Sequence, residues 1–547
     1  MTYESTKIKD IVDRAVNHAW SIPEFQRGFV WKATQVRDLA ESLWLDYPIG
    51  SLLVWNSHNP AEERVVTDAQ RPSLWVVDGQ QRATALAILF GRKPYWWPSA
   101  EEWESTRRRY DIRFDVDAKE PPYFVVANAA IRRTRGIRYM PLCNLLVLDT
   151  EEKAGQKELE RLAREVKAQD LAQGMDAMEV YTRLDRVRKI REKDVVTVTI
   201  DHELEDVVEI FSRLNSRGTR VTEADIYLGI VAARTPGWVR SSFLPYLDEL
   251  RDAGFDISPN LLFRTLTGVG AHRVRFKEIA DSFWEESTVV PAWTRTKQAW
   301  KNLILSFKDF GILSNDPLPT EAALVTMVAL MDKFSKAQFE PALYWFLQAS
   351  RFSRYSGSGT TSLDEDLRDV NESASIDEAV ERLLQRFPHT QELEPEDFQR
   401  DYLDARFLRF LLYLMVWNNK ALDWDERGHR LGFEGANILR NFRPQWHHVF
   451  PRKFLEGKVP LDRIDALANI AVIGESINIR ISAKDPMDYI ERYGVSDEKL
   501  AQQYMTNELR ETQAADYDQW LENRAISLAI AGNDYIATIR KAAGIGS

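Results

Sequence analysis

Two short apolar runs joined by a charged connector most strongly constrain how the C-terminal part of the chain can fold. The first run is WHHVF at 446–450 and the second is LANIAVI at 467–473, with GESINIR directly after it. Short apolar runs rich in β-branched and aromatic residues are typical of strands. Ser476 is of a residue type that often caps helices. The order predicts a two-stranded hairpin, followed by a helix that Ser476 caps and that carries Asn478.

Polar residues at defined places in this hairpin suggest phosphodiester cleavage. His447 and His448 are adjacent, and Asn469 and Asn478 follow in the second run and the helix. Cleavage needs a base that deprotonates water and a metal ion that neutralises the leaving oxygen. A histidine titrates near neutral pH, and its neighbour with a distant carboxamide can hold Mg²⁺. A purely structural interpretation stays open, because paired histidines are often surface or core residues and asparagines often occupy turns.

Together with Pro451, this pattern resembles the His-Me finger (HNH-type) nucleases. The resemblance is to the form that is fused to a DGQQR domain in type IV restriction and phage-defence proteins of the GmrSD kind. It implies that His448 is the general base and that His447 and Asn478 hold Mg²⁺ or Mn²⁺. It also implies that Asn469 fixes the loop that orients the base. Many of these nucleases have a histidine at the position of Asn478.

A second motif lies near the N-terminus, in SLWVVDGQQRATAL at 73–86. The pattern predicts a strand at 75–77, a tight turn at Asp78-Gly79 and a helix from Gln80. Free N–H groups and the helix dipole at such a junction suit a phosphate, and Arg82 can fork onto one. Asp78 could hold Mg²⁺ or a ribose hydroxyl. The structural alternative is that Asp78 only caps the helix and Arg82 pairs with an acid elsewhere.

The full string resembles the signature of the DGQQR-motif proteins, as do IPEFQRGFVW at 22–31 and FSRLNSRGTRVTEADI at 211–226. That family is associated with nucleotide binding and hydrolysis, so the resemblance implies a bound NTP, either ATP or GTP. The order of strand, turn and helix also resembles a ParB/sulfiredoxin-like α/β fold. The nucleotide-binding residues that the resemblance implies are Gln26, Arg27, Asp78, Gly79, Gln80, Gln81, Arg82, Arg213 and Asn215.

Length and composition indicate an ordinary multidomain protein of the cytoplasm. A chain of 547 residues is too long for one core. No apolar run approaches the roughly 20 residues that cross a bilayer, the first residues lack a signal-peptide core, and Cys143 is the single cysteine. The formal net charge of −11 argues against a uniformly basic surface for nucleic acid. Local phosphate contacts remain available near the hairpin, from Arg443, Arg452 and Lys453.

The predicted fold class is α+β, in three domains. Residues 1–235 are the nucleotide-binding or sensor domain, and a helix is expected over residues 1–20 because Ile8, Ile11, Val12 and Ala15 share one side. Residues 236–394 form a helical connecting region with a polar linker near 353–375. Residues 395–547 form a mostly helical domain around a ββα-metal nuclease core.

The resulting hypothesis is a nucleotide-regulated, metal-dependent endonuclease that restricts foreign, modified double-stranded DNA. The alternative is an NTP-dependent DNA-binding sensor with a degenerate nuclease domain, because the amide of Asn478 is a weaker metal ligand than an imidazole. A third interpretation makes Phe25, Phe29 and Trp31 an apolar niche for an altered base. A homodimer and partner defence proteins both stay open, and no membrane partner is expected.

Overall fold

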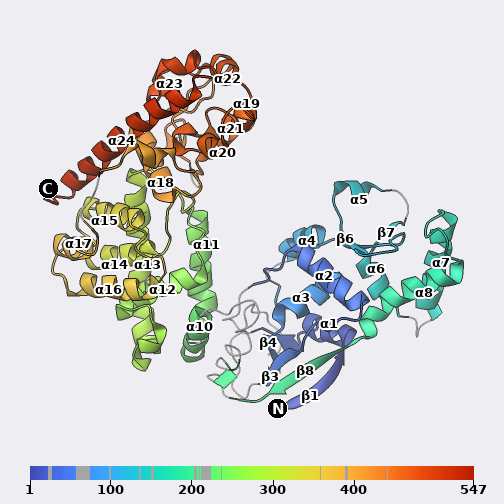
Figure 1. The fold of residues 1–547 in the computed structure, drawn as a ribbon. Coiled ribbons are helices and arrows are strands. Elements are labelled where there is room, and N and C mark those ends of the chain that lie inside the picture. Colours follow the sequence, from blue (N-terminus) through green and yellow to red (C-terminus); the bar gives the residue numbers. More distant parts are fainter. Residues whose placement is uncertain are drawn as a thin grey trace. The chain divides into compact units, whose positions relative to one another are not determined.

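The structure of the chain is a computed structural model. The chain divides into two compact units, Met1–Phe243 and Leu244–Ser547 (Figure 1). Both units are α+β, and within the described part of the chain no helix is long and apolar enough to cross a membrane. The predicted boundary after residue 235 lies close to this division, whereas the one after residue 394 falls inside the second unit. The described residues are 1–22, 28–56, 74–97, 100–134, 137–149, 153–202, 206–207, 210, 223–235, 237–357, 359–388, 392–439 and 442–546.

Unit 1 contains a five-stranded mixed sheet, a three-stranded antiparallel sheet and the helices that pack against them. Its elements are β1 (Thr2–Lys7), α1 (Ile8–Val16), β2 (Trp20–Ser21), α2 (Ala33–Trp44), β3 (Leu52–Asn56), β4 (Leu74–Asp78), α3 (Gln80–Leu89), α4 (Ala100–Arg109), β5 (Ile112–Asp115), β6 (Phe124–Val126), α5 (Ala129–Arg133), β7 (Tyr139–Pro141), α6 (Leu142–Leu146), α7 (Lys153–Ala168), α8 (Ala177–Arg188), η1 (Lys189–Glu192), β8 (Asp194–Ile200), α10 (Glu223–Arg234) and η3 (Val239–Phe243).

The large sheet of unit 1 has the strand order β1-β8-β3-β4-β2, and its central strands are buried on both faces. Leu52 and Val54 of β3 join the main core with α1, α2 and α3, whereas Leu53 and Trp55 join a smaller cluster on the other face. Successive strand residues point to opposite faces, so a strand covered on both sides reads as an unbroken apolar run. The run LLVW meets this requirement.

The predicted helix over residues 1–20 is wrong in its first part. Residues 2–7 form β1, which pairs antiparallel with β8, and α1 begins only at Ile8. The four apolar residues that predicted the helix are indeed its buried side. The expected strand at 75–77 is confirmed as β4.

Unit 2 combines a helical bundle with a region of short strands and short helices. Its elements are α11 (Leu244–Asp252), α12 (Pro259–Ala271), η4 (Phe276–Glu278), η5 (Asp281–Trp284), α13 (Glu286–Asp309), α14 (Ala323–Lys333), α15 (Glu340–Arg351), α16 (Gly359–Glu372), α17 (Ile376–Leu384), η6 (Pro395–Gln399), α18 (Arg406–Asn418), β9 (Phe433–Glu434), β10 (Asn437–Ile438), β11 (Gln445–His448), α19 (Arg452–Leu455), α20 (Leu461–Ile464), η7 (Leu467–Asn469), β12 (Ile470–Ile473), α21 (Glu475–Ile481), α22 (Pro486–Arg492), α23 (Asp497–Ala501), η8 (Asn507–Arg510) and α24 (Tyr517–Ala542).

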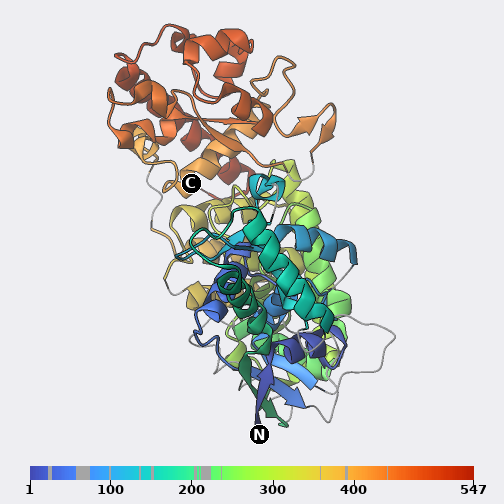
Figure 2. The same cartoon turned by 90° about the vertical axis from the view of Figure 1, so that its right-hand side faces the viewer.

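Helix α24 ties the two parts of unit 2 together. It contacts α15 in the bundle and η6, η7 and α18 near the strands, and Figure 1 shows it running from one part to the other. The short hairpin of β9 and β10 stands out from this unit as two small arrows in Figure 2. Helix α18, which begins at Arg406, is apolar and buried along most of its length.

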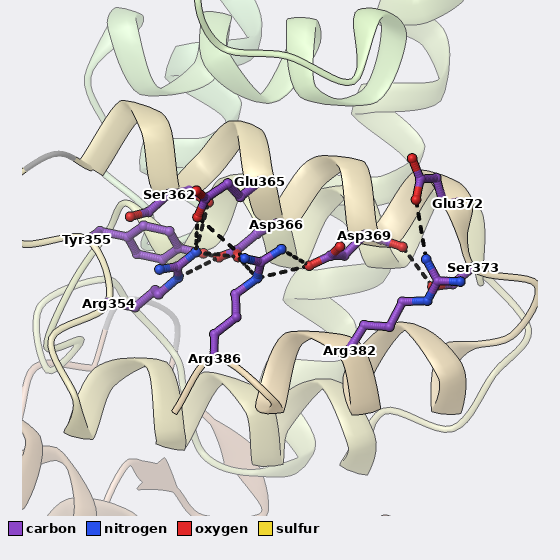
Figure 3. A network of polar contacts seen from close by, with 10 residues as sticks. All are labelled: Arg354, Tyr355, Ser362, Glu365, Asp366, Asp369, Glu372, Ser373, Arg382 and Arg386. Atoms are coloured by element: carbon purple, nitrogen blue, oxygen red, sulfur yellow. Dashed lines mark hydrogen bonds and ion pairs between the residues drawn. The ribbon is translucent and has the colours of Figure 1, made fainter. Parts of the chain in front are cut away.

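The polar segment 353–375 differs from the predicted linker, because most of it is helix α16, packed on α14 and α17. Its central carboxylate, Asp366, has a side chain that is 1% exposed. Arg354 and Arg386 form ion pairs with it at 2.9 and 3.3 Å, and the Tyr355 hydroxyl donates to it at 2.8 Å (Figure 3). The polar residues therefore form an internal network that anchors the helix.

Candidate active site

Strands β11 and β12 form an antiparallel hairpin at the centre of the C-terminal part of unit 2. His447 lies opposite Ala471 and His448 lies opposite Ile470. Every residue of β12 is buried, so the hairpin is fixed from the side of the core. Helix α21 follows directly. The predicted hairpin and helix are therefore present, although the residue at the N-cap is Gly474 and Ser476 lies inside the first turn.

His447 points to α21, where its Nδ1 lies 2.9 Å from Oδ1 of Asn478. The residue is 4% exposed, and its ring is edge-on to Trp424 and Tyr489, which stack on each other. Among the residues that the structure describes, its Nε2 has no hydrogen-bond partner. Burial lowers the pKa of His447 to about 4, so the imidazole is neutral at physiological pH. A neutral imidazole is the form that binds a metal ion.

The donor pair of His447 and Asn478 fits a small hard cation. Neighbouring ligands of an octahedral Mg²⁺, with bonds of about 2.1 Å, lie ~3 Å apart. The observed separation of 2.9 Å agrees with that value. In the metal-free protein this contact is a hydrogen bond; metal binding would require hydrogen on Nε2, which leaves the lone pairs of Nδ1 and Oδ1 for the ion. Magnesium usually keeps several water ligands and binds substrate phosphate, so two protein ligands are compatible with such a site.

His448 points away from His447, toward the connector between the strands. Its Nε2 lies 2.9 Å from Oδ1 of Asp465, and the ring of Tyr402 stands edge-on to it at 5.3 Å. The side chain is 17% exposed. Burial lowers the pKa of His448, and the hydrogen bond with Asp465 opposes this effect. The imidazole is thus held on one side and open on another, as a base that deprotonates water requires.

Asp465 is a site residue that the sequence analysis missed. It is 5% exposed and accepts two hydrogen bonds from Arg452, from Nε at 2.8 Å and from Nη2 at 2.6 Å. Its backbone oxygen accepts from the backbone N–H of Tyr402 at 3.0 Å. Because Asp465 lies in a connector with no motif of its own, its position four residues before Asn469 was the only available signal.

Asn469 is fully buried and joins the two ends of the connector. Its Oδ1 accepts from the N–H of Phe450 at 2.9 Å, and its Nδ2 donates to the carbonyl of Phe450 at 3.0 Å and to that of Ile464 at 2.9 Å. The carbonyl of Asn469 also accepts from the N–H of Val449 at 2.8 Å. The residue therefore connects the segment directly after His448 to the end of α20 through hydrogen bonds.

Arg524 of α24, which the sequence analysis also missed, holds the backbone around Asn469. It is 3% exposed and donates to the carbonyls of Ala468 at 2.7 Å, Ile470 at 2.8 Å and Gln503 at 3.2 Å. A buried guanidinium is costly without hydrogen-bond partners. Here three carbonyl oxygens compensate for the lost water.

The three cations predicted to contact DNA do not have equal freedom. Arg443 and Lys453 are exposed. Arg452 is also largely exposed, but its guanidinium is bound to Asp465, which raises its pKa. Two of the three side chains are thus available to a phosphate backbone, while the third also braces the site.

The N-terminal motif forms the predicted junction of strand, turn and helix. Gly79, between β4 and α3, has a φ of 87°, which a residue with a side chain rarely adopts. Arg82 donates to Asp78 Oδ2 at 3.0 Å and to the carbonyl of Ile49 at 2.8 Å. The structural alternative expected Arg82 to pair with an acid elsewhere, whereas its ion pair is with Asp78 of the same motif.

The two glutamines of the motif are also engaged. The amide of Gln81 accepts from the N–H of Val30 at 2.9 Å and donates to the carbonyl of Gly28 at 3.0 Å. Gln80 is 7% exposed at the first position of α3. Gln81 therefore holds the segment that follows the predicted IPEFQR motif. The other predicted nucleotide-binding residues, Gln26, Arg27, Arg213 and Asn215, lie outside the described residues, as does Phe25.

Comparison with known proteins finds two similarities. Residues 8–232 match the family model described as "GmrSD restriction endonuclease, N-terminal domain". The chain is also 22% identical, over 553 aligned positions, to an uncharacterized protein of Methanocaldococcus jannaschii, covering 90% of this chain and 87% of that protein. The second likeness therefore extends well beyond the part that matches the family model.

Proposed function

We propose that the chain is a metal-dependent DNA endonuclease that acts in the restriction of foreign DNA, with a nucleotide-responsive N-terminal unit. One observation carries the proposal. The neutral imidazole of His447 and the amide oxygen of Asn478 lie 2.9 Å apart. The neighbouring residue, His448, ends strand β11 and keeps 17% of its side chain exposed. This is the arrangement that a His-Me finger nuclease needs, and the similarity of residues 8–232 to a restriction endonuclease family supports the same reading.

In the proposed mechanism His448 takes a proton from a water molecule, which then attacks the phosphorus atom of the scissile bond. His447 and Asn478 would hold Mg²⁺ or Mn²⁺. When bound, such an ion neutralises the charge that develops on the departing 3′ oxygen. Asn469 keeps the loop after His448 in place. Cleavage by this route leaves 5′-phosphate ends.

Exposed cations near the hairpin support DNA as the substrate in spite of the acidic chain. Arg443 and Lys453 are free to contact phosphates, which supply most of the sequence-independent affinity for DNA. The binding should therefore weaken steeply as the salt concentration rises. We propose double-stranded DNA, with a chemical mark on phage DNA as the feature that distinguishes it.

The N-terminal unit is proposed to bind ATP or GTP at the junction of β4 and α3. The turn at Gly79 leaves backbone N–H groups of Gln80 and Gln81 at the start of a helix, a place that favours phosphate. Arg82 would exchange its contact with Asp78 for one with the nucleotide. Cleavage of plain and modified phage DNA, with each NTP added in turn, tests this half of the proposal. A cleavage rate that depends neither on the DNA modification nor on the nucleotide would contradict it.

The main test is plasmid cleavage in Mg²⁺ or Mn²⁺ by the wild type and by His448→Ala. Loss of a general base lowers a rate by about 10²–10⁴-fold. His429→Ala is the matched control, because His429 is a partly exposed histidine of the same unit that pairs only with Asp425. Chelation with EDTA should abolish cutting. Equal cutting by the wild type and His448→Ala would refute the assignment.

A second candidate, a DNA-binding switch that has lost cleavage, is favoured by one observation. Within the described part of the chain, no three His, Cys, Asp or Glu side chains gather as metal ligands. Titration calorimetry with Mn²⁺ separates the two candidates, since the nuclease requires binding that His447→Ala and Asn478→Ala abolish. A wild type that binds DNA but no metal ion would favour the switch.

A further inference from the structure

We infer that Asp465 is the positioning residue for His448, fixing hydrogen on Nε2 so that Nδ1 is the nitrogen that takes the proton from water. The inference rests on the proposed nuclease function and adds a residue to it. It begins from the contact of 2.9 Å between His448 Nε2 and Asp465 Oδ1.

The chemistry of an ionised carboxylate selects the ring form of His448. A carboxylate can only accept hydrogen bonds, so the nitrogen facing it must carry hydrogen. In a neutral imidazole the other nitrogen then has the lone pair. The carboxylate of Asp465 is also paired with Arg452, whose Nη2 lies 2.6 Å from its Oδ2.

The position of Asp465 is itself fixed by its surroundings. It follows the last residue of α20, and its backbone N–H donates to the carbonyl of Leu461 at 3.0 Å. Its carbonyl accepts from Tyr402, whose ring faces His448 from another side. The imidazole thus lies between a carboxylate that fixes its hydrogen and an aromatic ring that limits its rotation.

The free nitrogen of His448 is the one the reaction needs. Among the described residues, Nδ1 of His448 has no hydrogen-bond partner, and the side chain keeps 17% of its surface exposed. A water molecule can reach only an exposed nitrogen that has a lone pair. Asp465 thereby acts through His448 and does not touch the substrate.

A purely structural role is the competing explanation, since the pair of Arg452 and Asp465 could simply brace the connector. Asp465→Asn keeps the shape of the side chain, but its NH2 group cannot accept from Arg452, so the ring form of His448, which the brace does not set, is the measurement that separates the two roles. The amide can donate as well as accept, so it constrains less strictly which nitrogen of His448 carries hydrogen. The same exchange beside the base histidine of a serine protease lowers kcat about 10⁴-fold. Arg452 can hold the amide oxygen toward His448, so we expect a smaller effect here.

The first experiment reads the ring directly in the full-length protein. Long-range ¹H–¹⁵N spectra of protein labelled on its histidine rings, assigned with His448→Ala, should show His448 with hydrogen on Nε2 and a bare Nδ1. Hydrogen on Nδ1 in the wild type would overturn the inference, whether or not the protein cuts DNA.

The second experiment measures cleavage by Asp465→Asn. We expect kcat at least about tenfold below the wild type with an unchanged KM for DNA, since the substrate contacts are intact. Asp518→Asn is the matched control, because Asp518 also pairs with an arginine, Arg463, but lies on the surface. A normal kcat in Asp465→Asn would overturn the positioning role while leaving the nuclease assignment, which His448→Ala tests, in place.

Discussion

The side chain of Asn469 forms hydrogen bonds with both the backbone N–H and the backbone carbonyl of Phe450. Its Oδ1 accepts from the N–H of Phe450 at 2.9 Å, and its Nδ2 donates to the carbonyl of the same residue at 3.0 Å. The two contacts occupy all the backbone polar groups of Phe450, which lies two residues after His448. A side chain buried in the core thus decides the path of the loop beside the candidate base.

Asn469→Ala should therefore destabilise the protein strongly and abolish cleavage. It leaves three buried backbone groups without partners, and each such group costs about 1–3 kcal/mol. We expect a loss of at least about 3 kcal/mol in urea unfolding. Asn469→Asp is the matched variant, because it keeps the acceptor for Phe450 N–H but turns an oxygen toward two carbonyls. A stability equal to the wild type in both variants would contradict the role given to the amide.

Asp366→Ala should destabilise unit 2 by about 1–3 kcal/mol, because it removes the buried acceptor that Arg354 and the Tyr355 hydroxyl share, while Glu365 still pairs with Arg354. Asp366 is 1% exposed, and its partner Arg354 keeps only 16% of its side chain exposed (Figure 3). Glu372→Ala is the control, since the pair of Glu372 and Arg382 is largely exposed and should contribute less than about 1 kcal/mol. Denaturation midpoints of the two variants check this, and similar values would argue that α16 does not depend on its network.

His272→Asn should change how stability depends on pH. Burial and the charges of Arg295 and Lys333 lower the pKa of His272 below 6.5 in the folded protein, and Asp332 opposes them only in part. Between the folded and unfolded pKa values, the unfolded chain binds more protons, so the folded state loses stability as the pH falls through about 6.5. The variant lacks this loss.

Asparagine suits the position because His272 has a φ of 55°, a conformation that asparagine tolerates. Thermal unfolding at pH 7.5 and at pH 5.5 should show near-equal midpoints for the two proteins at the higher pH. At the lower pH the variant should be the more stable one. A wild type whose midpoint falls no more than that of the variant would disprove the effect.

Gly50→Ala should displace Arg82 from its site at the N-terminal motif. Gly50 has a φ of +83°, and an added Cβ would lie 2.3 Å from Nη1 of Arg82. A left-handed conformation costs a residue with a side chain about 1–2 kcal/mol, and the clash adds to it. Gly174→Ala isolates the first effect, because Gly174 has a φ of +84° with no atom within 4 Å of the added Cβ. Nucleotide binding by calorimetry, if Arg82 takes part, should weaken only in Gly50→Ala.

Local patterns predicted the elements of the candidate site but not the contacts between them. The apolar runs indicated the hairpin, and the place of Asn478 in the next helix brought it opposite His447. Asp465 could not be found in this way, since its contact with His448 depends on how a connector of short helices folds back. Likewise, Arg524 looks like an ordinary polar residue of α24 until its burial is known.

Two errors have physical causes of a similar kind. Residues 2–7 are a strand because they pair with β8, which lies far along the chain. The local sequence does not indicate this pairing. The polar composition of 353–375 suggested a linker. In the structure, however, Asp366 of this segment forms a buried ion pair with Arg386, which lies beyond the next helix. Composition reports polarity, whereas only the fold reports whether a polar group has a partner.

The contacts of Arg524 set the order in which the C-terminal part can be completed during synthesis. The guanidinium binds the carbonyls on either side of Asn469, and α24 begins only at Tyr517. A nascent chain that has released both histidines from the ribosome still lacks the arginine that fixes their scaffold. The candidate site is therefore complete only once residues up to Arg524 have been translated, well after both histidines.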